Sequence, residues 1–390
     1  MDKPIYLDYN ATTPLHPQVL EAMLPYLAEH FGNPSSSHPY GLMTKGAVEA
    51  AREQVTALLN CSPQEIVFTS GGTESNNTAI RGVASALRER GNHLITSAIE
   101  HPAVTEACRW LETQGFEITT LPVDGYGQVR PADLQAAMRS STILVSIMHA
   151  NNEVGTVQPI RELAAIAHRH GALFHTDAAQ SVGKLKVDVQ ELGVDLLAVA
   201  GHKLYAPKGV GVLYIREGIE IPNLMFGAGH ESGRRPGTEN VASIVGLGAA
   251  CQLASQDLDA LDNHLRGLRD RLHQSLQNFL GAEKVKLNGH PEARLPNTLN
   301  LSFRGVAANQ LLANIQEQVA ASAGSACHAD RVQTSEVLLA MGVPQEWAMG
   351  AVRFSVGRHT TPEEIDRAVE VIVAALGNQK IYPILDIPNL

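Results

Sequence analysis

The chain has 390 residues, of which 44% are hydrophobic and 18% charged, and its formal net charge is −10. This composition is typical of a folded globular protein rather than a disordered one, and the length favours more than one packed region. The acidic charge and the lack of a Lys/Arg run argue against direct nucleic-acid binding, and no apolar stretch of about 18 residues indicates a membrane span.

The N-terminal sequence and the cysteines bear on the cellular compartment. The opening stretch, MDKPIYLDYNATTP, lacks the apolar segment of a signal peptide. The four cysteines, Cys61, Cys108, Cys251 and Cys327, lie far apart and form no CxxC pair. This spacing argues against a disulfide framework and against a metal site. We therefore expect a protein of the reducing cytoplasm.

Short apolar runs alternate with helical patterns through the first two thirds of the chain. The expected strands lie at 65–70, 93–100, 141–150, 172–176, 194–201 and 209–216. Their alternation with helices predicts an α/β fold with a mostly parallel sheet covered by helices. In such sheets ligands bind outside the carboxyl ends of the strands, so the residues that follow each strand are the candidates for a site.

The pattern changes at about residue 257. A long amphipathic helix over 258–281 precedes strand-like segments and a final helix, which together predict a smaller α+β domain. We expect a large domain over 15–256 and a small domain formed by 1–14 together with 257–390. The apolar segment 379–390, with two prolines, is consistent with packing on a neighbour or with disorder.

Polar residues of suggestive types follow five of the expected strands. Glycines that enter a helix, as before Thr73, expose N–H groups to an anion, although such glycines are also common in turns. The other strand ends carry a histidine, an amide, a carboxylate and a lysine, each with an ordinary structural alternative such as a helix N-cap. These residues are Gly72, Thr73, His101, Asn152, Asp177, Gln180, His202 and Lys203.

Together these residues fit pyridoxal 5′-phosphate. Its aldehyde needs a lysine amine for a Schiff base, and burial lowers the pKa of a lysine toward the reactive neutral form. Its pyridine nitrogen needs an acidic partner to stay protonated, and Asp177 lies one strand before Lys203. Of the nine lysines, Lys203 alone directly follows an apolar strand, and Lys208, after Pro207, is the second choice.

The residues also resemble a known family. Along the chain occur YLDYNATTP, FGNPSSSH, EIVFTSGGTESNN, HANNEVGTVQPI, HTDAAQSVGK, GHKLYAPKGVGVLYIR, GRRPGTEN, GSAC and VRFSVGRHTT. This set resembles the cysteine desulfurases of the class V aminotransferase group, which have the fold-type-I architecture of pyridoxal-phosphate enzymes. The resemblance runs in order from about residue 4 to about residue 370.

The resemblance implies a role for each residue around the cofactor. Lys203 would form the Schiff base, Asp177 would pair with the pyridine nitrogen, and His101 would stack on the ring and assist proton transfer. The remaining contacts would come from Asn152 and Gln180 at the ring oxygen, and from the backbone at Gly72, Thr73 and His202 at the phosphate.

The resemblance further implies a partner subunit, a substrate site and a nucleophile. Thr238 would reach the phosphate in the other subunit of a homodimer. Arg353, assisted by Asn33, would bind the substrate carboxylate. Cys327 would take the sulfur as a persulfide. From the residues alone, the small side chains around Cys327 suit a moving sulfur carrier, but an ordinary loop cysteine fits them as well.

Two departures leave the substrate open at this point. Family members usually have a hydroxyl residue where this chain has Ala200, which removes one phosphate contact. That position is apolar in proteins similar to selenocysteine lyase, and FGAGHESGRRPGTEN and ACHAD are also similar to them. Against this, those lyases tend to have an acid where this chain has Pro102.

We therefore expect a cysteine desulfurase that converts L-cysteine to L-alanine and a persulfide for a sulfur acceptor, such as an iron–sulfur scaffold protein. The alternative within the enzymes is selenocysteine lyase, which releases selenide from L-selenocysteine. An alternative of another class is a catalytically silent scaffold on the same fold. The presence of Lys203, Asp177, His101, Arg353 and Cys327 together argues against that scaffold.

Overall fold

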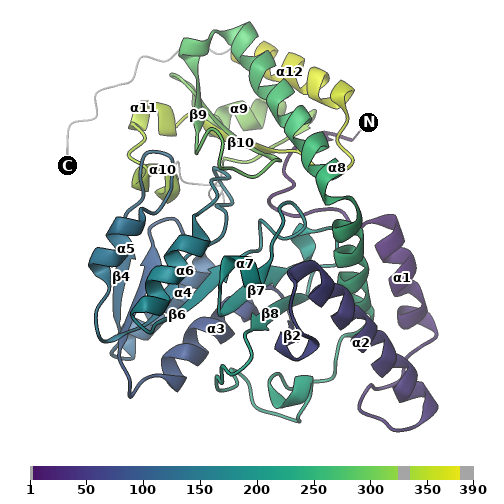
Figure 1. The fold of residues 1–390 in the computed structure, drawn as a ribbon. Coiled ribbons are helices and arrows are strands. Elements are labelled where there is room, and N and C mark those ends of the chain that lie inside the picture. Colours follow the sequence, from purple (N-terminus) through teal and green to yellow (C-terminus); the bar gives the residue numbers. More distant parts are fainter. Residues whose placement is uncertain (1–2, 324–333, 378–390) are drawn as a thin grey trace.

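The computed structural model describes residues 3–323 and 334–377. It shows two packed regions joined by one long helix (Figure 1). The strands are β1 (Ile5–Tyr6), β2 (Ile66–Thr69), β3 (His93–Ser97), β4 (Glu117–Leu121), β5 (Thr142–Ser146), β6 (Leu173–Asp177), β7 (Leu196–Ala200), β8 (Gly211–Ile215), β9 (Val285–Asn288), β10 (Thr298–Phe303), β11 (Val319–Ala320) and β12 (Ala351–Ser355). The helices are α1 (Pro17–Ala28), α2 (Pro39–Leu59), α3 (Gly72–Ala86), α4 (Pro102–Thr113), α5 (Pro131–Ala137), α6 (Ile160–Arg169), α7 (Val189–Leu192), α8 (Val241–Leu280), α9 (Ala308–Ile315), α10 (Glu336–Ala340), α11 (Gln345–Ala348) and α12 (Pro362–Gly377).

A seven-stranded sheet organises the larger region, in the order β2-β8-β7-β6-β5-β3-β4. Strand β8 runs antiparallel to β2 and β7, and the other neighbours are parallel, which confirms the predicted mostly parallel sheet. Strand β3 ends at Ser97, earlier than the apolar pattern indicated. The sequence analysis missed β4 because this edge strand is largely accessible to solvent and therefore lacks a continuous apolar run.

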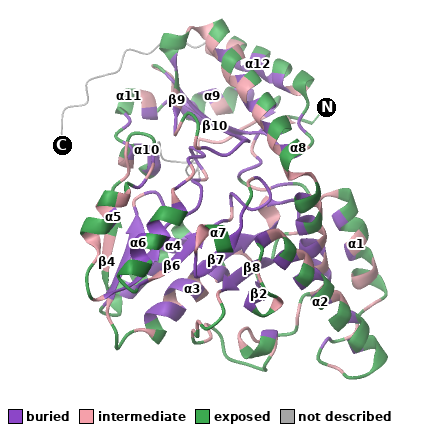
Figure 2. Cartoon of the chain, in the orientation of Figure 1, coloured by how far each residue is buried: buried purple, intermediate pink, exposed green. Residues whose placement is uncertain are grey.

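Helices cover both faces of this sheet, and alternation along a strand decides which face a side chain meets. In β2, Phe68 packs in the core with residues of α2, α6 and α8, whereas Val67 packs with residues of α3 and α4. Apart from the edge strand β4, the strands of the sheet are almost entirely buried (Figure 2). Burial on both faces leaves the strand ends as the places where polar side chains can gather.

The smaller region is built on an antiparallel sheet in the order β12-β10-β9. Its core contains Leu265 and Leu272 of α8, Phe354 of β12 and Ile365 of α12. The N-terminal strand β1 pairs in parallel with β11, which attaches the start of the chain to this region. The described C-terminal segment thus mixes helices and an antiparallel sheet, as an α+β region does.

Helix α8 is longer than the helix predicted over 258–281. It has 40 residues and contains one non-helical residue, Asp257, with φ −135° and ψ 21°. Its first half is rich in small residues that pack closely, so it lacks a clear amphipathic pattern. A Cβ at Gly248 would lie 2.7 Å from the Cβ of Ala51 in α2. The domain boundary expected between residues 256 and 257 falls within this helix and stays a prediction.

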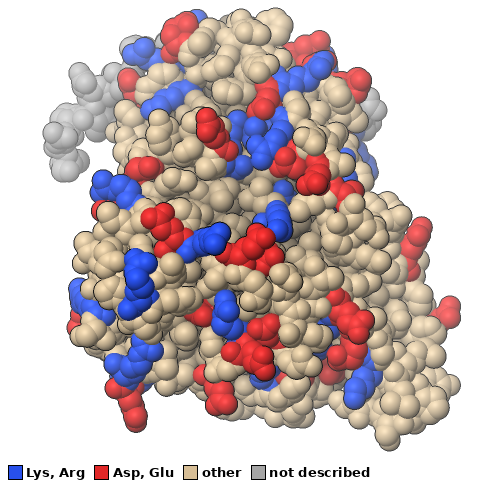
Figure 3. All heavy atoms as spheres, in the orientation of Figure 1, with Lys and Arg blue, Asp and Glu red and all other residues tan. Residues whose placement is uncertain are grey.

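Within the described residues, no helix combines the length and the apolar character that crossing a membrane requires. On the face drawn in Figure 3, positive and negative side chains are interspersed rather than separated.

Candidate active site

Asp177 is the last residue of β6, and Lys203 follows β7, which is the parallel neighbour of β6. The carboxylate of Asp177 is buried and accepts hydrogen bonds from Asn76 Nδ2 at 2.7 Å and from the Ala179 N–H at 2.9 Å. Asn76 lies on α3, so a helix on one face of the sheet fixes an acid at its edge. The sequence analysis did not single out Asn76, whose side chain lies one turn inside α3.

Lys203 lies in a short 3-10 turn (Gly201–Lys203) directly after the buried strand β7. Its ammonium donates to the carbonyl oxygen of Asn10 and, at 2.8 Å, to that of Ala11. Desolvation by burial, with a further contribution from Arg353, lowers the pKa of Lys203 to about 8. The amine is therefore neutral more often near neutral pH than a surface lysine is, as nucleophilic chemistry requires.

His101 caps the N-terminus of α4, where its Nδ1 accepts from the Ala103 N–H at 3.1 Å. An imidazole that accepts at Nδ1 carries its proton at Nε2 when it is neutral. Desolvation lowers the pKa of His101, while Asp177 raises it and Lys203 lowers it further. Asp177 and Lys203 thus both act electrostatically on the ring, and the lowered pKa keeps the imidazole in a form that is able to accept a proton.

The N-terminus of α3 provides a site for an anion. Gly71 precedes this helix with φ +144° and makes no side-chain cap, so the first N–H groups of a 15-residue helix have no side-chain partner there. A Cβ at Gly72 would lie 3.3 Å from the Cβ of Ala200, at the end of β7. Thr73 is exposed on the same turn. The cradle therefore opens at the edge of the sheet that also bears Lys203.

His202 also faces the N-terminal segment. Its Nδ1 lies 3.2 Å from Thr12 Oγ1, and its carbonyl oxygen accepts from the N–H and the hydroxyl of Thr13. Burial, together with the neighbouring Lys203, lowers the pKa of His202 to about 4. The imidazole is thus neutral at physiological pH and can serve as a hydrogen-bond partner rather than as a charge.

Arg353 lies in β12 of the second sheet and extends toward the same edge. Its guanidinium donates to Asp8 Oδ1 at 2.7 Å and to the carbonyl oxygen of Asn152 at 3.1 Å. Its Nε is buried and has no hydrogen-bond partner among the described residues. A buried and unpaired donor on an anchored guanidinium fits an incoming carboxylate. Asp8 was not anticipated as its anchor.

Asn10 forms hydrogen bonds with several residues of this site. The sequence analysis did not identify it either. Its side chain donates to the carbonyl oxygen of Asn152 at 3.1 Å and to Thr298 Oγ1 at 2.8 Å. Its own carbonyl oxygen accepts from Gln180 Nε2 at 3.0 Å and from the Lys203 ammonium. The motif YLDYNATTP signalled this segment, but neither Asp8 nor Asn10 received a role from the sequence.

The chain does not bring every predicted residue to this edge. Asn33 lies in the exposed loop between α1 and α2, where its Oδ1 accepts from the Ser35 N–H at 2.9 Å. Thr238 is exposed before α8, and its side chain makes no hydrogen bond within the described part of the chain. Cys327 and the segment 379–390 lie outside the described residues.

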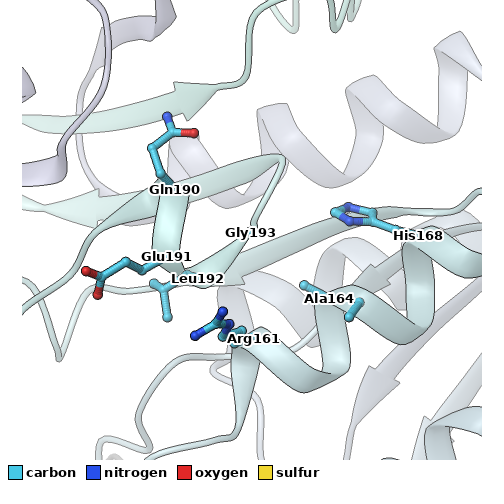
Figure 4. A pocket seen from close by; sticks show the side chains of 8 residues that line it. Arg161, Ala164, His168, Gln190, Glu191, Leu192 and Gly193 are labelled. Atoms are coloured by element: carbon cyan, nitrogen blue, oxygen red, sulfur yellow. The ribbon is translucent and has the colours of Figure 1, made fainter.

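Two further features concern metals and cavities. The described residues contain no group of three His, Cys, Asp or Glu side chains able to hold a metal ion. A cavity of about 240 Å³ lies between α6 and α7, away from the strand ends described above (Figure 4). Its His168 is already bonded to Asp195 at 2.7 Å. This cavity contains none of the residues predicted for the site.

Comparisons with known proteins match this arrangement. The family model for aminotransferase class-V covers residues 5–368. A cysteine desulfurase IscS from Dictyoglomus turgidum is 50% identical over 373 residues, which are 95% of this chain and 94% of that protein. The cysteine desulfurase IscS of Methanosarcina thermophila is 48% identical over 372 residues, which are 95% of this chain and 91% of that protein.

Solved structures show the same likeness. A NifS-like protein superposes with a TM-score of 0.90 at 37% identity, over 96% of this chain and 100% of the other. The structure titled SspA in complex with cysteine gives a TM-score of 0.79 at 37% identity, over 92% of this chain and 100% of the other. Similarity over the whole chain shows that the architecture, and not only one motif, is shared.

The fold is that of the aminotransferase class-V enzymes with the NifS-like architecture. This chain belongs to that family, and within it to the cysteine desulfurases. Its activity is the removal of sulfur from cysteine, and the selenocysteine lyase alternative is not favoured. The chain is therefore an enzyme rather than a silent scaffold.

Proposed function

We propose that the strand-end site holds pyridoxal 5′-phosphate and that its residues have the roles expected from the sequence. The observation that carries this proposal is the meeting of Asp177, Lys203, His101 and the N-terminus of α3 at one edge of the sheet. These groups match an acid for a ring nitrogen, an amine for an aldehyde, a ring to stack on and a cradle for a phosphate. When bound, this cofactor supplies an electron sink for carbanion chemistry.

The chain itself orients the substrate and moves its protons. Arg353 binds the substrate carboxylate while Asp8 fixes the guanidinium, and Asn33 would assist from the second copy of a homodimer. Lys203 Nζ and the imidazole of His101 give and take protons at the reacting carbons, which their lowered pKa values favour. The side-chain amides of Asn152 and Gln180 contact the cofactor oxygen, and Thr73, the Gly72 N–H and His202 hold its phosphate.

Cys327 is the nucleophile in this proposal. Burial raises the pKa of Cys61, Cys108 and Cys251 to about 12, so none of these three thiols supplies a thiolate near neutral pH. The Cys327 thiolate attacks the sulfur of the substrate, the carbon–sulfur bond breaks and a sulfur–sulfur bond forms. A proton replaces sulfur on the carbon, which gives L-alanine and the Cys327 persulfide.

The enzyme acts as a homodimer in this account. An apolar stripe of Leu20, Leu24 and Leu27 is exposed on α1, and Phe31 beyond it is 79% exposed. Residues 30–44 contain no Lys, Arg, Asp or Glu, so this surface carries little charge to oppose burial. In such a dimer Thr238 would reach the phosphate in the other subunit, as the family resemblance implies. The persulfide would then pass to an acceptor such as an iron–sulfur scaffold protein in the cytoplasm.

The test of the proposal is alanine and persulfide formation from L-cysteine by Cys327→Ala. We expect this variant to lose persulfide formation and desulfuration while it still binds pyridoxal phosphate. Cys61→Ala is the matched control, since Cys61 is partly exposed but has a raised pKa, and it should react as the unmodified enzyme does. L-Selenocysteine is compared in parallel, because selenium leaves more readily. Unchanged desulfuration of cysteine by Cys327→Ala would refute the persulfide route.

A further inference from the structure

Lys184 is a buried cation for which the proposed chemistry has no use. It is 5% exposed and lies in the turn that follows β6. No carboxylate lies within ion-pair distance of it among the residues that the structure describes. Its ammonium instead donates to two neutral oxygens of Gln180, the carbonyl oxygen at 3.0 Å and the side-chain Oε1 at 3.1 Å. Buried lysines without a carboxylate are costly, so this contact calls for a functional explanation.

The contact fixes the direction of the Gln180 amide. An ammonium has three donors and no acceptor, so the amide must turn its oxygen toward Lys184. The opposite end, Nε2, then donates at 3.0 Å to the carbonyl oxygen of Asn10. That same carbonyl accepts from the Lys203 ammonium. A flipped amide would place Oε1 against the Asn10 carbonyl and an N–H against the ammonium, so both ends would be repulsive.

Gln180 therefore presents N–H groups, not an oxygen, beside the catalytic lysine. We propose that Lys184 is a positioning residue, an inference that rests on the proposed function. Lys184 holds the Gln180 amide so that the amide donates a hydrogen bond to the ring oxygen of the cofactor. Lys184 acts through Gln180 and does not touch the cofactor. The charge that it carries also polarises the amide and strengthens Nε2–H as a donor to an anionic oxygen.

The charges that act on Lys184 are consistent with an anion bound nearby. Burial, together with the positive charges of Lys203 and Arg353, lowers the pKa of Lys184 to about 7. The positive charges of Lys203 and Arg353 thus act on a third basic side chain. An anionic oxygen near these basic side chains would reduce the electrostatic repulsion between them.

A double-mutant cycle tests the inference. Lys184→Met, Gln180→Leu and the double variant are purified without cofactor and titrated with pyridoxal phosphate by absorbance. We expect each single variant to raise the dissociation constant about tenfold, the worth of one hydrogen bond, and the double variant to bind no more than about twofold worse than Gln180→Leu. Lys186→Met is the matched control, because Lys186 lies two residues away with its side chain 68% exposed, and it should bind as the unmodified protein does.

The visible absorption of the bound cofactor gives a second readout that general destabilisation does not move. Without the donor, the pH midpoint of that absorption rises by about one unit, since a hydrogen bond to the anionic oxygen favours its charged form. Gln180→Glu keeps the Lys184 contact but lacks an N–H, so it should show the same rise even if Lys184→Met does not fold.

Three outcomes would overturn the assignment: additive effects in the cycle, binding by Lys184→Met equal to that of the unmodified protein, or an unchanged midpoint in Gln180→Glu. The proposed function fails separately, through absence of cofactor binding by the unmodified protein. The two failures are therefore distinguishable.

Discussion

The predicted site divides into an interior half and a surface half that differ in how far one chain completes them. In the interior half, Asp177, Gln180, Lys203 and Arg353 are held by hydrogen bonds to groups such as Asn10 and Asp8. In the surface half, Asn33, Thr73 and Thr238 are exposed, and α1 presents an apolar stripe to solvent. The interior is thus organised by the fold of one chain, whereas in the proposed homodimer the surface half is completed by a second copy.

Loss of the interior amine should have the largest effect. Lys203→Ala should lower kcat for desulfuration by about 10³-fold, because it removes both the amine that binds the cofactor and a proton-transfer group. Lys208→Ala is the control, since Lys208 is exposed five residues later, and its rate should equal that of the unmodified enzyme. Alanine release measures both. An equal loss of kcat in Lys203→Ala and Lys208→Ala would contradict the assignment of the reactive amine to the buried lysine.

The pH dependence of stability should show that Lys203 is held in a desolvated interior. Its pKa of about 8 in the folded apoprotein lies below the ordinary value of 10.5. Between these two pH values the unfolded chain binds more protons than the folded one, so stability rises with pH. Between pH 8 and pH 10.5 the free energy of unfolding of the cofactor-free protein should rise by about 3 kcal/mol relative to that of Lys203→Met.

Urea unfolding of both proteins across this range provides the measurement, and effects common to the two cancel in the difference. A difference in unfolding free energy that stays constant with pH would mean that Lys203 is solvated like a surface lysine.

Changes to the surface half should act through assembly and have a smaller effect on the rate. Leu24→Asp with Leu27→Asp should convert the dimer to monomers, because a dimer would have to bury two carboxylates in an apolar interface. Activity should fall about tenfold, the worth of the one hydrogen bond that Thr238 supplies. Phe279→Asp, at an apolar residue 70% exposed near the end of α8, should leave the dimer intact. Sedimentation velocity reports the mass, and an active monomer would contradict this division of the site.

The difference between the two halves also explains what the sequence revealed. Asp177 and Lys203 were found because Asp177 ends one buried strand and Lys203 follows another, which is a local signal. Asn10 and Asp8 were not assigned roles because they follow a strand of only two residues, and nothing local shows that several of their partners lie 170 to 345 residues later in the chain. Asn76 was missed for the same reason, since its partner Asp177 comes from a distant strand.

The central claim is that each site takes Lys203 from one chain and Thr238 from the other. The direct test is a dimer made by coexpressing Lys203→Ala and Thr238→Asp chains with different tags and purified over both. Each parent homodimer should be nearly inactive, since one lacks the amine and the other places a carboxylate against a phosphate. The mixed dimer should recover about half of the unmodified activity, because one of its two sites then contains both native residues. A mixed dimer no more active than its parents would show that Thr238 serves its own chain, and would contradict the account.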